Sequence, residues 1–176
     1  MFADDVVVAK DTMPDKSRVL SGKPRKRVAV VTCIDCRLTN LVEESLGLER
    51  GDAVTIKLAG NTIANEEVFR SLAVAIYGLN VETVYVVGHT DCGMANLDIS
   101  EFTESIRRAG VPPEAVCASS ISEWLGLFSD IRQNVQDNIA KLRQSRVIPD
   151  RVRISGFVID SDTGKLEEIQ ETDCTI

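Results

Sequence analysis

The sequence lacks the features that mark membrane proteins and nucleic-acid-binding proteins. None of its apolar runs is long enough to span a bilayer. The acidic start, Met1–Asp5, also lacks the basic-then-apolar order of a signal peptide. Basic residues are outnumbered, with 20 Lys and Arg against 27 Asp and Glu and a net charge of −7. Because phosphate contacts need a basic surface, we expect neither a membrane nor a nucleic acid among the partners of this protein.

Cysteine and histidine are scarce as well. Five cysteines are too few, and odd in number, for a disulfide scaffold. Histidine occurs once, at position 89. A reducing cytoplasm is therefore the expected setting, and there cysteines near a histidine indicate a metal site or a catalytic site. The length of 176 residues predicts one domain with a sizeable core.

The apolar patterns that are present predict an α/β fold. Runs of β-favouring residues indicate strands over 28–32, 53–57, 83–88 and 152–159, with a returning edge strand over 165–169. Helical spacing predicts helices over 40–48, 65–78, 99–109 and 131–142. This order favours a mainly parallel sheet of strand order 2-1-3-4, with an antiparallel C-terminal edge strand and helices on both faces. We assign residues 28–176 to this single domain and residues 1–27 to an N-terminal arm.

Two of the predicted strands end in side chains that can bind a metal. Cys33 follows the first strand, and His89 and Cys92 follow the third. His89 and Cys92 are three residues apart, so one tight turn can direct both side chains at the same point. In the predicted strand order the first and third strands are neighbours. Their C-terminal ends form the switch point at which such sheets bind ligands.

Cys33, His89 and Cys92 together make a Cys2His set. This set suits zinc and leaves a fourth position open, as in catalytic zinc sites. The alternative is that His89 is a buried core histidine and the cysteines are small hydrophobes, which is the usual meaning of an isolated His-x-x-Cys. The convergence with Cys33 at the switch point favours the metal site.

Asp35 and Arg37 are candidates for the layer next to this site. If the chain stays extended after Cys33, the two-residue period places Cys33, Asp35 and Arg37 on one face and Cys36 on the other. A carboxylate would then lie beside the metal, held by a guanidinium. The alternative is a surface ion pair, which contributes little to stability.

Three motifs in this order resemble those of the β-class carbonic anhydrases, in their compact microbial branch. They are Cys-x-Asp-x-Arg at 33–37, Ala-Gly-Asn at 59–61 and His-Thr-Asp-Cys-Gly-Met at 89–94. The resemblance runs from about residue 28 to residue 169 and includes the C-terminal hairpin. It implies zinc on Cys33, His89 and Cys92, an Asp35–Arg37 dyad, and reversible hydration of carbon dioxide to bicarbonate and a proton.

The same resemblance implies an assembly and a pocket. It predicts an obligate homodimer or a higher homo-oligomer, with the pocket at the subunit interface and the arm 1–27 packed on the partner. It also places Gly60, Asn61, Gly93 and Met94 near the substrate pocket.

Cys36 departs from the family pattern, which usually has serine or alanine there. The resulting Cys-x-x-Cys leaves two other readings open, a dithiol redox site and a closed Cys3His structural zinc site. A third alternative lies within the family, because carbonyl sulfide hydrolases and carbon disulfide hydrolases resemble the anhydrases at the metal site. The His-Thr-Asp-Cys-Gly-Met motif favours carbon dioxide.

Overall fold

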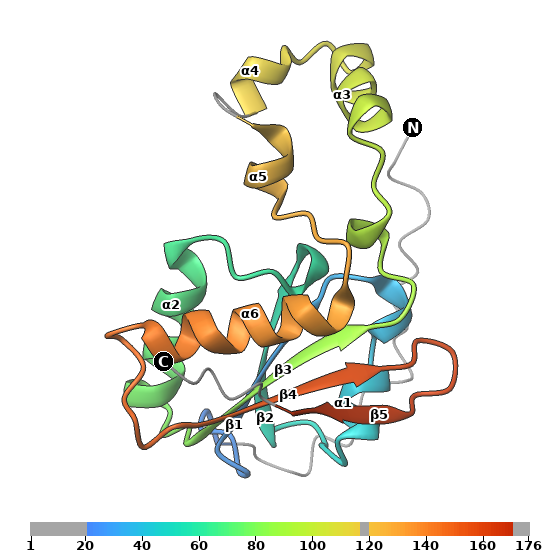
Figure 1. The fold of residues 1–176 in the computed structure, drawn as a ribbon. Helices are drawn as coiled ribbons and strands as arrows, with labels where there is room; N and C mark the ends of the chain where they lie inside the picture. Colours follow the sequence, from blue (N-terminus) through green and yellow to red (C-terminus); the bar gives the residue numbers. More distant parts are fainter. Residues whose placement is uncertain (1–20, 117–119, 171–176) are drawn as a thin grey trace, which may run out of the picture.

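The computed structural model describes residues 21–116 and 120–170, which build a five-stranded sheet of order β2-β1-β3-β4-β5 (Figure 1). The strands are β1 Val28–Cys33, β2 Ala53–Leu58, β3 Thr83–His89, β4 Arg153–Ile159 and β5 Leu166–Ile169. The first four are parallel, and β5 runs antiparallel to β4 at the edge. The predicted strand order and edge strand are confirmed.

The helices are α1 Leu41–Ser45, α2 Glu66–Ala73, α3 Ile99–Arg108, α4 Pro113–Val116, α5 Ile121–Leu125 and α6 Ile131–Gln144. Short 3-10 turns are η1 Cys36–Leu38, η2 Ala59–Asn61 and η4 Gly93–Ala95, and a π-helical turn, η3 Val74–Gly78, continues α2. The predicted helix over 40–48 is wrong at its C-terminal end. Gly47, with φ 63°, ends α1 early, because Leu48 N donates to Glu43 O and Gly47 N donates to Glu44 O.

Helices cover both faces of the sheet, as predicted. α2 and α6 pack on one face, where Ala29 and Val31 of β1 join a large apolar cluster. α1 packs on the other face, where Val28 and Val30 belong to a second cluster that also contains Cys33. The central strands β1 and β3 are thus buried on both sides, which explains their continuous apolar runs.

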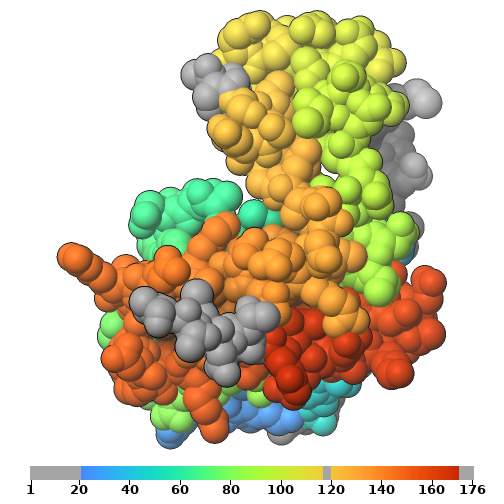
Figure 2. Space-filling model, viewed as in Figure 1, coloured from blue at the N-terminus to red at the C-terminus, as the bar shows by residue number. Residues whose placement is uncertain are grey.

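The helices α3, α4 and α5 stand above the sheet as a separate layer (Figures 1 and 2). None of the residues in these three helices is buried in the described part of the chain. Trp124 is 53% exposed, whereas Phe128, four residues later, packs against the cluster that contains Cys33. The chain therefore leaves the body after η4 and returns to it before α6.

Residues 1–20 of the predicted arm lie outside the described residues. The end of the arm lies beside the turn before β2, where Arg25 Nε donates to Asp52 Oδ1 at 2.6 Å. Within residues 21–116 and 120–170, no helix has the length and apolar character needed to cross a membrane.

Candidate metal centre

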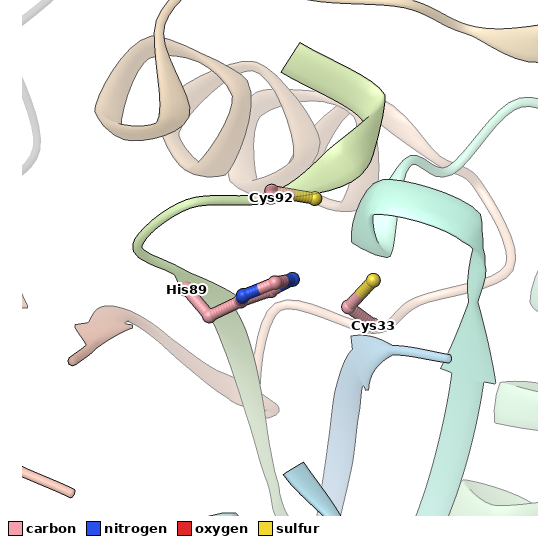
Figure 3. A group of neighbouring side chains, drawn as sticks. All are labelled: Cys33, His89 and Cys92. Carbon is pink, nitrogen blue, oxygen red and sulfur yellow. The ribbon is translucent and has the colours of Figure 1, made fainter. Parts of the chain in front are cut away.

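The parallel pairing of β1 and β3 brings Cys33 and His89 to the same edge of the sheet. Thr32 pairs with Val87, and each strand ends one or two residues later. Cys92 follows His89 after a tight turn, and the three side chains point toward one another (Figure 3). One ligand atom from each of the three lies within 4.8 Å of the other two, and all three residues are buried. The sequence prediction that these residues converge is confirmed.

His89 presents a free nitrogen to this cluster. Its Nδ1 lies 2.9 Å from Thr90 O, so that nitrogen carries the hydrogen and donates it. Its Nε2 then has a lone pair, and it is buried without a hydrogen-bond partner among the described residues. Burial of an unpaired polar atom is costly. A cation bound between Nε2 and the two sulfurs would remove that cost.

The two thiols of the cluster interact directly. The hydrogen bond between them, opposed by burial, lowers the pKa of Cys33 to about 4, with further help from His89 and from the backbone N–H groups of Asp35 and Gly60. The Cys33 thiolate and burial raise the pKa of Cys92. A dication beside both sulfurs would hold both as thiolates. Two thiolates and a neutral imidazole are donors that suit zinc.

The comparisons with known proteins agree with this geometry. The family model for carbonic anhydrase matches residues 28–166. The chain belongs to the β-class carbonic anhydrases. It is 33% identical to a β-carbonic anhydrase crystal structure from Trichomonas vaginalis, with a TM-score of 0.81 and coverage of 88% of this chain and 87% of that chain.

Two curated relatives of this chain are named for different activities. Beta-carbonic anhydrase 1 of Mycobacterium tuberculosis is 30% identical over 147 residues, which cover 83% of this chain and 83% of that protein. A carbon disulfide hydrolase of Acidianus is 28% identical over 169 residues, covering 86% of this chain and 81% of that protein. The match therefore includes proteins with two different named substrates.

In this member of the family, Asp35 and Arg37 form an ion pair by a route that differs from the prediction. The chain does not stay extended, because η1 begins at Cys36. Asp35 caps that turn by accepting a hydrogen bond from Arg37 N at 2.9 Å. The turn brings the guanidinium back onto the carboxylate, with Nε to Oδ1 at 3.0 Å and Nη2 to Oδ2 at 2.8 Å. The predicted pair is present, but the extended segment proposed for it is wrong.

The turn also places Asp35 next to the cluster. Asp35 Oδ2 lies 3.9 Å from His89 Nε2. The Arg37 side chain, opposed by burial and aided by the Arg37 backbone N–H, lowers the pKa of Asp35 to about 2. Asp35 in turn raises the pKa of Arg37. Cys36 is exposed, and it is not a member of the cluster that the described residues form.

Asp91 is a participant that the sequence analysis missed. Arg37 Nη1 donates to Asp91 Oδ2 and Arg37 Nη2 donates to Asp91 O, both at 2.9 Å. Asp91 has φ 52°, a left-handed conformation that aspartate tolerates better than most residues. Its place between His89 and Cys92 was visible in the sequence, but nothing in the spacing indicated a bond to a residue 54 positions away.

The four residues predicted near the substrate pocket lie in two short turns, Gly60 and Asn61 in η2 and Gly93 and Met94 in η4. Gly60 has φ 62°, and a Cβ there would lie 2.8 Å from Phe128 Cε1 and 2.9 Å from Met94 Cβ. Met94 and Gly93 belong to η4, directly after Cys92. The side chain of Asn61 is buried and accepts a hydrogen bond from a residue of α6. Contact between any of these residues and a substrate remains a prediction.

Proposed function

We propose that this β-carbonic anhydrase binds one zinc ion at Cys33, His89 and Cys92 and catalyses the reversible hydration of carbon dioxide to bicarbonate and a proton. One observation carries the proposal. The buried Nε2 of His89, which has no hydrogen-bond partner within residues 21–116 and 120–170, faces two thiol sulfurs at the switch point of the sheet. When bound, zinc would supply the Lewis acidity that generates a nucleophile from water at neutral pH.

The residues beside that centre supply an ionised carboxylate and fix its orientation. Asp35, with its lowered pKa, stays ionised and can accept a hydrogen bond from a reacting water or from bicarbonate. Arg37 fixes the direction of that carboxylate by two parallel hydrogen bonds, since its fork of donors matches the two oxygens. Met94 and Phe128 pack at the Gly60 side and would limit the access of bulk water.

The proposal extends to assembly, pocket and location. Gly60, Asn61, Gly93 and Met94 would border the substrate pocket of the domain 28–176. The arm 1–27 would pack on the partner of a homodimer or a higher homo-oligomer. A reducing cytoplasm would keep the ligand thiols available for the metal.

Hydrolysis of carbonyl sulfide or carbon disulfide at the same site is the second candidate. The relative named as a carbon disulfide hydrolase supports it. A closed Cys3His site and a dithiol site receive less support, because Cys36 is exposed and begins η1 on the outside of the cluster.

The test is metal analysis followed by initial rates on the same preparation. We expect about one zinc per chain in protein purified without added metal, and rapid hydration of carbon dioxide by stopped-flow pH indicator. Hydrolysis of carbon disulfide or carbonyl sulfide with negligible carbon dioxide hydration would replace the first candidate by the second. Absence of bound metal together with absence of all three activities would overturn both.

A further inference from the structure

Helix α6 carries two buried asparagines on the face that it turns to the sheet. Its neighbours on that face, Val135, Ile139 and Leu142, are part of the apolar core. Asn134 is 6% exposed and Asn138 is fully buried. A buried amide is costly unless its hydrogen bonds are made, so the partners of these two side chains indicate why they are present.

Both side chains bind the backbone of the segment that follows β2. Asn134 Nδ2 donates to Gly60 O at 2.9 Å and to Asn61 Oδ1 at 3.1 Å. Asn138 Nδ2 donates to Asn61 O at 3.1 Å, and Asn138 Oδ1 accepts from Ile63 N at 2.9 Å. The two asparagines also bind each other, at 3.3 Å. We call this set of hydrogen bonds the asparagine clamp.

The segment that the clamp holds has little support of its own. Gly60 and Asn61 are consecutive residues in the left-handed region, with φ values of 62° and 50°. The 3-10 turn η2 is closed by one backbone hydrogen bond of 3.2 Å, from Thr62 N to Ala59 O. Left-handed residues rarely occur in succession without contacts that fix them. The clamp supplies such contacts from an element more than 70 residues away.

The same segment touches the metal centre. Cys33 pairs with Leu58 at the end of β2, so η2 begins beside this ligand residue. The backbone N–H of Gly60 helps to lower the pKa of the Cys33 thiol. Asn134 therefore holds Gly60 at its carbonyl oxygen, while the N–H of Gly60 lies on the side of Cys33. Figure 3 shows the turn after β2 lying beside Cys33, and Figure 1 shows α6 lying across one face of the sheet.

We propose that Asn134 and Asn138 are positioning residues of the metal centre, which hold η2 so that the Gly60 N–H stays on the Cys33 sulfur. This inference rests on the metal site of the proposed function and not on its substrate. A hydrogen bond to a ligand sulfur withdraws charge from it and fixes its direction. Loss of such an outer partner typically costs about 10- to 100-fold in metal affinity or activity.

The test compares Asn134→Leu with Leu142→Ala in the full chain. Leucine has the same number and branching of side-chain heavy atoms as asparagine, with bulkier methyl groups, and makes none of the hydrogen bonds. Leu142 is a fully buried residue of the same helix that packs in the apolar core, so its truncation lowers stability without touching the clamp. Zinc affinity is measured by competition with a chromophoric chelator, and the sulfur-to-cobalt charge-transfer band is recorded on the cobalt-substituted proteins.

We expect Asn134→Leu to lower zinc affinity about tenfold and to shift the charge-transfer band. Leu142→Ala should lower the melting temperature and leave both readouts at wild-type values. Wild-type affinity and an unchanged band in Asn134→Leu would overturn the inference. Equal changes in both variants would also overturn it, because they would show a general effect of lost stability.

A second substitution covers the case in which Asn134→Leu does not fold. Asn134→Ser keeps a small polar side chain that is too short to reach Gly60 O, and the same two outcomes are read from it. A wild-type chain that binds neither zinc nor cobalt would overturn the metal site and this inference together. A chain that binds zinc but does not hydrate carbon dioxide would overturn the proposed reaction and leave the clamp to be decided by the cobalt spectra.

Discussion

Arg37 donates two hydrogen bonds of 2.9 Å to Asp91, one to its carboxylate and one to its backbone oxygen. The same guanidinium binds Asp35, so it bridges the segment that follows β1 and the segment that follows β3. Each of those segments adjoins residues of the Cys2His set. Arg37 is therefore a link between the two halves of the site as well as the partner of Asp35.

Asp91→Ala should affect catalysis more than stability. The side chain of Asp91 is 76% exposed, and exposed ion pairs contribute about 0–1 kcal/mol. Removal of its carboxylate frees one side of the guanidinium and loosens the Asp35 carboxylate, so we expect a several-fold lower hydration rate. Glu67→Ala is the matched control, since Glu67 forms an exposed ion pair with Arg70 on α2. Denaturant unfolding and stopped-flow rates measure the two effects, and equal hydration rates in both variants would contradict the prediction.

Asp35→Asn should reduce the hydration rate sharply while zinc stays bound. Since the folded pKa of Asp35 is about 2, below the ordinary value of about 3.9, its contribution to stability is present above pH 4 and is lost as the pH falls toward 2. Acid unfolding of the wild type should therefore show a loss of stability in this pH window that Asp35→Asn lacks.

The Asp35 carboxylate stays ionised at higher pH. A rise in hydration through the neutral and alkaline range should therefore come from the metal and its water, and a flat profile would count against this.

Cys36→Ser should keep zinc and most of the hydration activity, whereas Cys92→Ala should lose zinc. Cys36 is exposed and Cys92 is one of the three clustered ligands. Zinc content, melting temperature and hydration rate of both variants, measured on matched preparations, separate the three readings of the Cys-x-x-Cys. Loss of metal in Cys36→Ser would instead favour the closed Cys3His structural site.

Gly60→Ala should destabilise the protein by about 1–3 kcal/mol. Gly60 has φ 62°, and the added methyl group would lie 2.8 Å from Phe128 and 2.9 Å from Met94. Gly93→Ala is the matched control beside the same site, because a Cβ at Gly93 meets no atom within 4 Å and its φ is not positive. Differential unfolding in denaturant should show the loss for Gly60→Ala alone.

The purified protein should have a mass of at least twice the 19.3 kDa of one chain. Light scattering during size exclusion, at micromolar concentration and at two salt concentrations, checks this. A single 19.3 kDa species with full hydration activity would show that the pocket is complete within one chain.

The strand order and the convergence of Cys33, His89 and Cys92 were predictable because they depend on short-range patterns and one rule of topology. Two buried strands that are parallel neighbours must end at the same edge, and the ligands follow those ends directly. Asp35 and Arg37 were predicted on the assumption of an extended segment after Cys33, which is wrong. The capping of η1 by Asp35 brings the two residues together instead.

The remaining parts of the site depend on contacts between segments far apart in the chain. The bond from Arg37 to Asp91 spans 54 residues, and the bond from Asn134 to Gly60 spans 74. Two polar residues four positions apart on an otherwise apolar helix face were a usable signal for Asn134 and Asn138. Their partners could not be named from it, because η2 carries no pattern that points to α6.

The layer of α3, α4 and α5 should unfold locally more easily than the central strands of the sheet. Among the described residues, none in these helices is fully buried, so their hydrogen bonds can break without exposing the core. β1 and β3 lie between two strands each and are covered on both faces. Amide hydrogens of the helical layer should exchange with solvent through frequent local openings, while those of the two central strands exchange only when the whole domain unfolds. Cys33 is the last residue of β1 and His89 is the last residue of β3. The strands expected to exchange most slowly therefore carry two of the three clustered side chains.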